Sequence, residues 1–158
     1  MPNATEQFTP RLLRVCLFAQ EEAQVLASPG IGTEHLLLAL VRESDGIAGQ
    51  VLARRGIMLS PLRVAVRGMI RKHPPPQTSG LAPDAQAAIA AGDEAARCGQ
   101  GYVGTEHLLL GMLGAEDSSA IALLRRFGIA PRQVQEDVER ILASPGYADG
   151  STPAHGEG

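Results

Sequence analysis

The chain has 158 residues, a net charge of −3, 44% hydrophobic residues and only 3% aromatic residues. This apolar content argues against wholesale disorder, and the acidic balance argues against a nucleic-acid-binding protein, which usually has a basic surplus. No apolar run approaches the roughly 18 residues of a membrane span, no signal segment opens the chain, and two cysteines are too few for a disulfide framework. We therefore expect a cytoplasmic protein that does not enter a membrane.

The first half of the chain predicts four helices. Thr9 is suited to the N-cap of the first helix and Pro10 to its first turn. Thr33 is expected to cap the second helix, and Gly56 to end the third in left-handed geometry. Apolar residues recur at helical spacing in the fourth. The four predicted segments are residues 8–27, 33–42, 47–55 and 60–70.

The second half repeats the first at an offset of 72 residues. The heptapeptide Gly-Thr-Glu-His-Leu-Leu-Leu of residues 32–38 recurs without change at 104–110, and Gly56-Ile57 recurs as Gly128-Ile129. No stretch of five or more residues alternates as a strand should. Four further helices are predicted over residues 83–98, 105–113, 118–127 and 131–142. The sequence therefore predicts an all-α fold of about eight helices in two pseudo-symmetric four-helix repeats.

The composition also predicts the domain organisation. Three consecutive prolines mark an extended linker between the repeats, and a Gly-, Pro- and Ser-rich stretch ends the chain. Each repeat alone is small for a stable core, so the two are expected to pack as one domain over residues 8–142. The predicted parts are a flexible N-terminus at 1–7, repeat one at 8–72, the linker at 73–80, repeat two at 81–142 and a disordered tail at 143–158.

The repeated motif contains the residues with the clearest chemical meaning. Glu34 and Glu106 stand in the first turn of a helix, where a carboxylate interacts favourably with the helix dipole, and this structural role alone could explain both. His35 and His107 lack the spacing of a metal site and are interpreted as hydrogen-bonded, packed histidines. Lys72, the only lysine, follows no Gly-rich turn, so the sequence has no P-loop. We expect neither a metal nor a cofactor.

The two heptapeptide copies make the chain resemble the N-terminal repeat domain of Clp ATPases, most closely that of the C type. Phe8-Thr9-Pro10-Arg11 and Ala19-Gln20-Glu21-Glu22-Ala23 are similar to that family too, and the resemblance covers about residues 8–142. In the family, this domain precedes ATPase modules that unfold substrates and feed a barrel-shaped protease. Because those modules are missing from these 158 residues, the resemblance implies a stand-alone binding module, an accessory or decoy to a full-length Clp ATPase.

The resemblance also implies a ligand. The family's domain recognises adaptors and unfolded segments and, in Gram-positive C-type proteins, phosphoarginine. By resemblance, Glu34 and Glu106 would hold the guanidinium, and Thr9 would face the phosphate. A carboxylate can bind a guanidinium through two hydrogen bonds, and a helix N-terminus can bind a phosphoryl group. The second repeat has Leu81-Ala82-Pro83-Asp84 where the family usually has an aromatic residue followed by Thr-Pro-Arg, so its pocket is expected to be degenerate.

In actinobacterial relatives, the family surface around the starts of the first helix of each repeat binds cyclic peptide antibiotics. An aromatic side chain is the kind of anchor that dominates binding energy. The positions that match this groove are Phe8, Leu13, Leu17, Leu81 and Gln86.

The sequence thus favours a non-enzymatic binding module whose partners are Clp components, adaptors, substrate proteins and possible cyclic peptides. One alternative is a structural assembly factor that docks on the Clp protease or on the ATPase ring. A second alternative is a hydrolase that uses Cys98 or His107, but no base is placed beside the cysteine. Cys16 and Cys98 are expected to fill small apolar gaps instead.

Overall fold

The computed structural model describes residues 7–72, 80–97 and 101–144, and over these ranges the chain forms eight α-helices. They are α1 (Pro10–Val25), α2 (Thr33–Arg42), α3 (Ile47–Arg54), α4 (Leu59–Lys72), α5 (Pro83–Arg97), α6 (Thr105–Leu113), α7 (Ser119–Arg126) and α8 (Pro131–Leu142). The only extended pairing within the described ranges consists of two isolated β-bridges. The predicted all-α fold with two four-helix repeats is confirmed.

Several predictions fall on residues outside the described ranges. They concern the start of the flexible N-terminus (1–6), the linker (73–79), most of the tail (145–158) and Cys98. Within the described ranges, none of the helices combines the length and the apolar character that a membrane span requires.

The helix ends lie within about two residues of the predicted ones, and one predicted cap is wrong. Thr9 is the N-cap of α1, and its hydroxyl oxygen accepts a hydrogen bond from the Leu12 amide at 3.2 Å. Gly56 has a φ of +87°, the left-handed geometry predicted for the end of α3. The prediction that Thr33 caps α2 is wrong, because Gly32 is the N-cap and Thr33 is the first helical residue. The hydroxyl of Thr33 is instead used in contacts with the other repeat.

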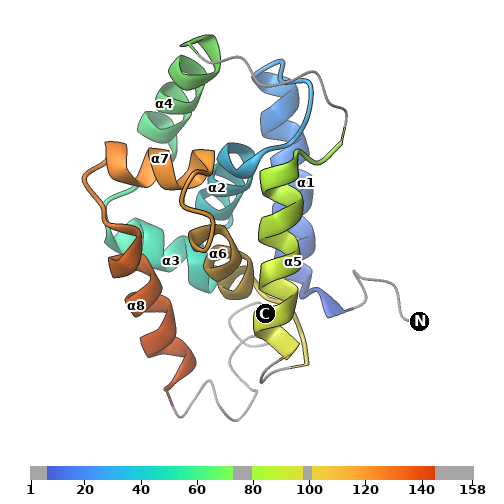
Figure 1. The fold of residues 1–158 in the computed structure, drawn as a ribbon, viewed down its shortest axis with the longest axis vertical. Coiled ribbons are helices and arrows are strands. Elements are labelled where there is room, and N and C mark those ends of the chain that lie inside the picture. Colours follow the sequence, from blue (N-terminus) through green and yellow to red (C-terminus); the bar gives the residue numbers. More distant parts are fainter. Residues whose placement is uncertain (1–6, 73–79, 98–100, 145–158) are drawn as a thin grey trace.

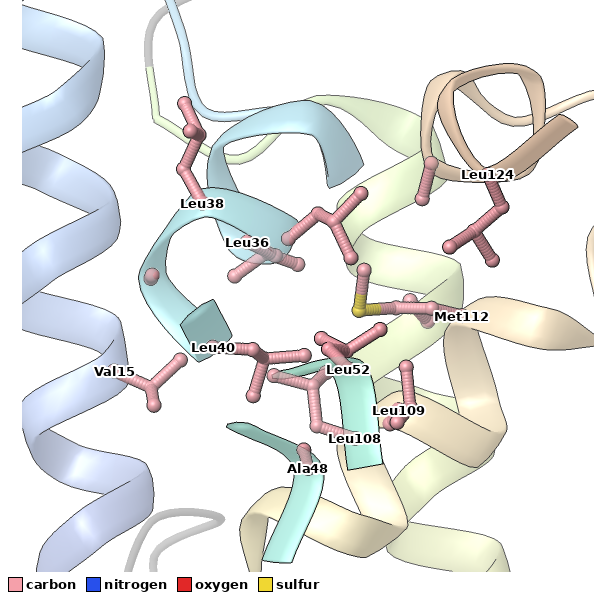
Figure 2. Close-up of a cluster of buried hydrophobic side chains, with 14 of the residues drawn as sticks. Val15, Leu36, Leu38, Leu40, Ala48, Leu52, Leu108, Leu109, Met112 and Leu124 are labelled. Atoms are coloured by element: carbon pink, nitrogen blue, oxygen red, sulfur yellow. The ribbon is translucent and has the colours of Figure 1, made fainter. Parts of the chain in front are cut away.

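Helices α2 and α6 lie in the middle of the molecule, between α1 and α5 on one side and the remaining helices on the other (Figure 1). This position explains the composition of the repeated motif. In α2, every residue from Thr33 to Leu40 is buried, so the helix is apolar around almost its whole circumference. The core gathers between α2, α3 and α6, where Leu40, Leu52 and Leu109 point toward one another (Figure 2).

Helices α5 and α6 approach each other closely through glycine. A Cβ atom built on Gly111 would overlap the carbonyl oxygen of Ala88 and lie 2.7 Å from the backbone nitrogen of Gly92. A Cβ on Gly92 would lie 2.8 Å from the carbonyl oxygen of His107. Because the obstacles are backbone atoms, a side chain at either position forces the two helices apart.

We expect Gly111→Ala to lower the free energy of unfolding by about 1–3 kcal/mol through overpacking, although alanine is the better helix former. Gly68→Ala in α4 is the matched control, since nothing lies within 4 Å of a Cβ there. The control should raise the free energy of unfolding by about 0.5–1 kcal/mol. Urea denaturation measures both, and equal stabilisation by the two substitutions would show that α5 and α6 are not in backbone contact.

Candidate functional site

The two repeats exchange their N-terminal segments. Phe8 forms a β-bridge with Val103, and the Thr9 amide donates to the Val103 carbonyl at 2.9 Å. In the same way Ile31 forms a bridge with Leu81, where the Ala82 amide donates to the Ile31 carbonyl at 2.8 Å. The start of α1 therefore lies beside the start of α6, and the start of α5 lies beside the start of α2. We call these two places the α6 end and the α2 end.

This exchange decides which predicted residues meet. Thr9 lies at the α6 end, together with Glu106 of the second repeat. Glu34 lies at the α2 end, where the neighbouring helix start is that of α5 and contains Asp84. Each end therefore combines a glutamate from one repeat with a helix start from the other. The sequence identity between the repeats does not reveal this arrangement.

Both glutamates are buried and folded back over the first turn of their own helix. Glu106 is 2% exposed and Glu34 is 6% exposed. A Cβ built on Gly104 would overlap a carboxylate oxygen of Glu106, and one on Gly32 would overlap a carboxylate oxygen of Glu34. The glycine of each motif thus makes room for the carboxylate two residues later. Both carboxylates stand where the positive end of a helix dipole stabilises negative charge.

At the α6 end, the first turn of α1 supplies no acidic residue. Thr9 is 8% exposed and caps α1 with its hydroxyl group. Arg11 is 3% exposed. Its Nη1 lies 3.6 Å from Oε1 of Glu43, the residue that caps the C-terminus of α2. The Thr105 hydroxyl oxygen accepts a hydrogen bond from the Ala48 amide at 3.3 Å, which joins α6 to the start of α3.

At the α2 end, a carboxylate from the second repeat binds the helix start. The hydroxyl group of Thr33 donates to Oδ2 of Asp84 at 2.8 Å, and the Thr33 amide donates to Oδ1 at 3.3 Å. Burial, and less strongly the negative charge of Asp84, raise the pKa of Glu34 above its ordinary value. The Thr33 hydroxyl oxygen also accepts from the Ala120 amide at 3.0 Å. These bonds replace the capping role that the sequence predicted for Thr33.

The two motif histidines cap their own helices, which confirms their interpretation as hydrogen-bonded, packed side chains. Nδ1 of His35 accepts the Gly32 amide hydrogen at 2.9 Å, and Nδ1 of His107 accepts that of Gly104 at the same distance. Each histidine is 1% exposed, and burial lowers the pKa of each to about 4. Both rings are therefore neutral at pH 7, as an accepting Nδ1 requires.

The residues of the predicted peptide groove do not all lie together. Phe8 is at the α6 end, while Leu81 is at the α2 end beside Ile31. Leu13 and Leu17 lie four residues apart on the outer face of α1 and are 43% and 58% exposed. Gln86 is exposed, and its side-chain amide donates to the Leu81 carbonyl at 2.8 Å. Of the groove positions predicted on α1, Leu13 and Leu17 are thus exposed apolar side chains on one helix face.

Sequence reasoning missed two features of these ends. One is the exchange of helix starts between repeats. The other is the bond from Thr33 to Asp84, residues that are 51 positions apart in the chain. The available signal was the difference between Arg11 and Asp84, each of which follows the proline that opens its helix. The difference revealed an altered charge but not which glutamate that charge would face.

Comparison with known proteins assigns this arrangement to a family. A profile described as the Clp repeat (R) N-terminal domain matches residues 7–97 and 81–155. The chain is 38% identical over 140 residues to the negative regulator of genetic competence ClpC/MecB of Bacillus subtilis, covering 87% of this chain and 17% of that protein. It is 35% identical to the chloroplastic chaperone protein ClpC of Pisum sativum, covering 97% of this chain and 17% of that protein.

Solved structures show the same fold. The N-terminal domain of ClpD from Arabidopsis thaliana matches with a TM-score of 0.75 and 25% identity, over 88% of this chain and 96% of that one. The Hsp104 N-terminal domain from Candida albicans matches with a TM-score of 0.67 and 18% identity, over 88% and 93% of the two chains. The chain thus spans a whole N-terminal domain but only about a sixth of the curated relatives described above.

Proposed function

The chain belongs to the family of Clp repeat N-terminal domains, and from this we propose that it is a non-catalytic binding module of the Clp proteolysis system. It recognises adaptors, exposed peptide segments or proteins marked with phosphoarginine in the cytoplasm. In doing so it acts as an accessory to a full-length Clp ATPase or competes with that ATPase for the same ligands. Competition requires no chemistry, because two receptors of similar affinity divide a ligand according to their concentrations.

The observation that supports this function is that the start of α1, capped by Thr9, lies beside the start of α6, which contains Glu106. Helix starts present amide groups and positive dipole ends to an anion. A carboxylate such as that of Glu106 is the group that binds a guanidinium through paired hydrogen bonds. A phosphorylated arginine contains both groups, one at each end of its phosphorus–nitrogen bond. The exposed Leu13 and Leu17 on α1 offer apolar contact to a peptide segment or a cyclic peptide.

Calorimetric titration with free phosphoarginine tests the proposal. Glu106→Ala removes the carboxylate that pairs with the guanidinium and should weaken binding at least about tenfold, because a charge-assisted hydrogen bond contributes roughly 1.5–3 kcal/mol. Glu116→Ala is the matched control, since this glutamate is exposed in the loop before α7. It should leave the affinity unchanged.

A different result favours the alternative of an assembly factor. If phosphoarginine gives no heat and the chain still co-purifies with Clp ATPase or protease subunits, whether or not Glu106 is replaced, the protein docks without using this site. Saturable binding that the Glu106→Ala variant loses supports the ligand-receptor function instead.

A further inference from the structure

A cavity of about 270 Å³ opens between α3 and α8, which lie against each other across the two repeats (Figure 1). It is formed by the last turn of α3 with its C-cap residue and by the second half of α8. None of its lining residues belongs to the α2 end or to the α6 end. The lining consists of Val51, Arg54, Arg55, Asp137, Arg140 and Ile141.

Three arginines share one carboxylate in this cavity. Nε and Nη2 of Arg55 donate to the two carboxylate oxygens of Asp137 at 2.7 and 2.9 Å. This hydrogen bonding lowers the pKa of Asp137, so the carboxylate is charged at pH 7. Nη1 of Arg140 lies 3.4 Å from Oδ1 of the same group, and the Arg140 side chain is 75% exposed. Arg54 is exposed, and its side chain makes no ion pair or hydrogen bond with any described residue.

The lining therefore has two positive charges in excess, in a chain whose net charge is −3. Glu136 lies close enough to Arg55 to raise its pKa, but it stands outside the lining and pairs with Arg132 at 3.6 Å. One positive charge remains in excess even when Glu136 is counted. The cavity thus has arginine donors that the described residues leave unused.

The equivalent place in the other half of the molecule has no such cluster. Helices α7 and α4 contact each other there, as α3 and α8 do here. Because that contact forms with mostly uncharged residues, packing of the helix pair does not by itself require the three arginines. At the offset of 72 residues, the counterparts are Arg126 for Arg54, Phe127 for Arg55, Ala65 for Asp137 and Gly68 for Arg140.

The chemistry of the cavity fits a carboxylate side chain. Guanidinium groups bind carboxylates through paired, charge-assisted hydrogen bonds. Arg54 and Arg140 are both exposed and come from different helices, so an anion from solvent reaches the space between them. The apolar side chains of Val51 and Ile141 complete the lining and suit the aliphatic part of a peptide. Asp137 repels a doubly charged phosphate more strongly than a singly charged carboxylate, which favours the carboxylate.

We propose that the cavity between α3 and α8 binds an acidic peptide segment of a partner protein. Arg54 and Arg140 hold its carboxylate, and Asp137 keeps Arg55 in place beside them. The inference goes beyond the proposed function, because it concerns another surface of the molecule and a ligand without phosphoarginine. A titration in which phosphoarginine fails to bind would leave it standing.

Fluorescence anisotropy of a short labelled peptide that alternates aspartate and leucine tests the proposal on the full chain. A peptide with asparagine in place of each aspartate is the control ligand and should not bind. Arg54→Gln with Arg140→Gln should weaken binding of the acidic peptide about five- to tenfold, as expected for the loss of two exposed ion pairs. Added salt should weaken it too, because it screens exposed charges.

The matched control variant is Arg67→Gln with Arg126→Gln. It removes the same charge from two exposed arginines of α4 and α7, the equivalent helix pair, and should leave the affinity unchanged. Thermal melting establishes that each variant is folded. If Arg54→Gln with Arg140→Gln melts early, Arg54→Glu replaces it, because Arg54 has no partner among the described residues to lose.

Four outcomes overturn the inference. No saturable binding of the acidic peptide would show that the cavity is not a receptor for it. Equal weakening by the two double variants would reduce the effect to overall charge. Displacement of the peptide by equimolar inorganic phosphate would identify a phosphate site instead. Loss of peptide binding in Glu106→Ala, with the affinity kept in Arg54→Gln with Arg140→Gln, would place the peptide at the α6 end.

Discussion

Lowering the pH from 6.5 to 4 is expected to reduce the free energy of unfolding by up to about 3 kcal/mol for each of His35 and His107. Burial lowers the pKa of both side chains to about 4, whereas an unfolded histidine titrates near its ordinary value of 6.5. Between these values the unfolded chain binds more protons than the folded chain. The stabilisation is therefore complete above about pH 6.5 and is lost as the pH falls toward 4.

The hydrogen bonds of the two histidines also predict a loss of stability at low pH. Nδ1 of each ring accepts an amide hydrogen at 2.9 Å, so a proton on that nitrogen would remove the cap and place two hydrogens against each other. The negative charges of Glu22 and Asp84 raise the pKa of His35, but burial outweighs them. Because the raised pKa of Glu34 acts in the opposite direction, its protonation restores part of the loss at the acid end.

Urea denaturation at pH 7.5, 6.5, 5.5 and 4.5 measures the effect. The double variant His35→Gln with His107→Gln is the control, because glutamine offers an oxygen acceptor in the first helical turn and does not titrate. Its stability should depend much less on pH over this interval. An unchanged pH dependence in the double variant would show that other groups cause the acid sensitivity.

Glu22→Ala is expected to lower the free energy of unfolding by about 3–5 kcal/mol, because it removes one partner of a buried ion-pair network. The Glu22 side chain is 2% exposed. Its carboxylate accepts from Nε and Nη2 of Arg63 at 2.9 and 2.8 Å and from Nη1 of Arg42 at 3.1 Å. One residue thereby joins α1, α2 and α4, and these arginines lower the pKa of its carboxyl group.

Glu21→Ala provides the matched control at the adjacent position. Glu21 pairs with Nη2 of the same Arg42 at 2.9 Å, but its side chain is 57% exposed. An exposed ion pair contributes about 0–1 kcal/mol, so the control should cost no more than that. Arg42 also stacks over the ring of Phe18 at 4.1 Å, a contact that persists in both variants. If the two substitutions lower the free energy of unfolding by similar amounts, burial does not determine how much the Glu22 network contributes to stability.

Local sequence signals predicted most of the helices because they act within a few residues. Thr9 and Pro10 determined the start of α1, and Gly56, in left-handed geometry, determined the end of α3. The segments predicted for α6 and α8 match the structure at both ends. Thr33 was the exception. Its position suited a cap, but Gly32 has the extended backbone conformation of an N-cap and takes that position. The side chain of His35 supplies the acceptor for the Gly32 amide.

The duplication and the all-α class were thus determined by the sequence itself, through helical period, turn residues and an exact repeat. The residues of the candidate site were proposed from the family that the repeated motif resembles. Only the tertiary structure decided that Thr9 lies at the same end as Glu106 and that Glu34 lies near Asp84. Two identical motifs look the same in sequence whether each repeat packs on itself or exchanges its first segment with the other. The choice is made by backbone pairing across the chain, as between Phe8 and Val103 or Ile31 and Leu81, which no local pattern encodes.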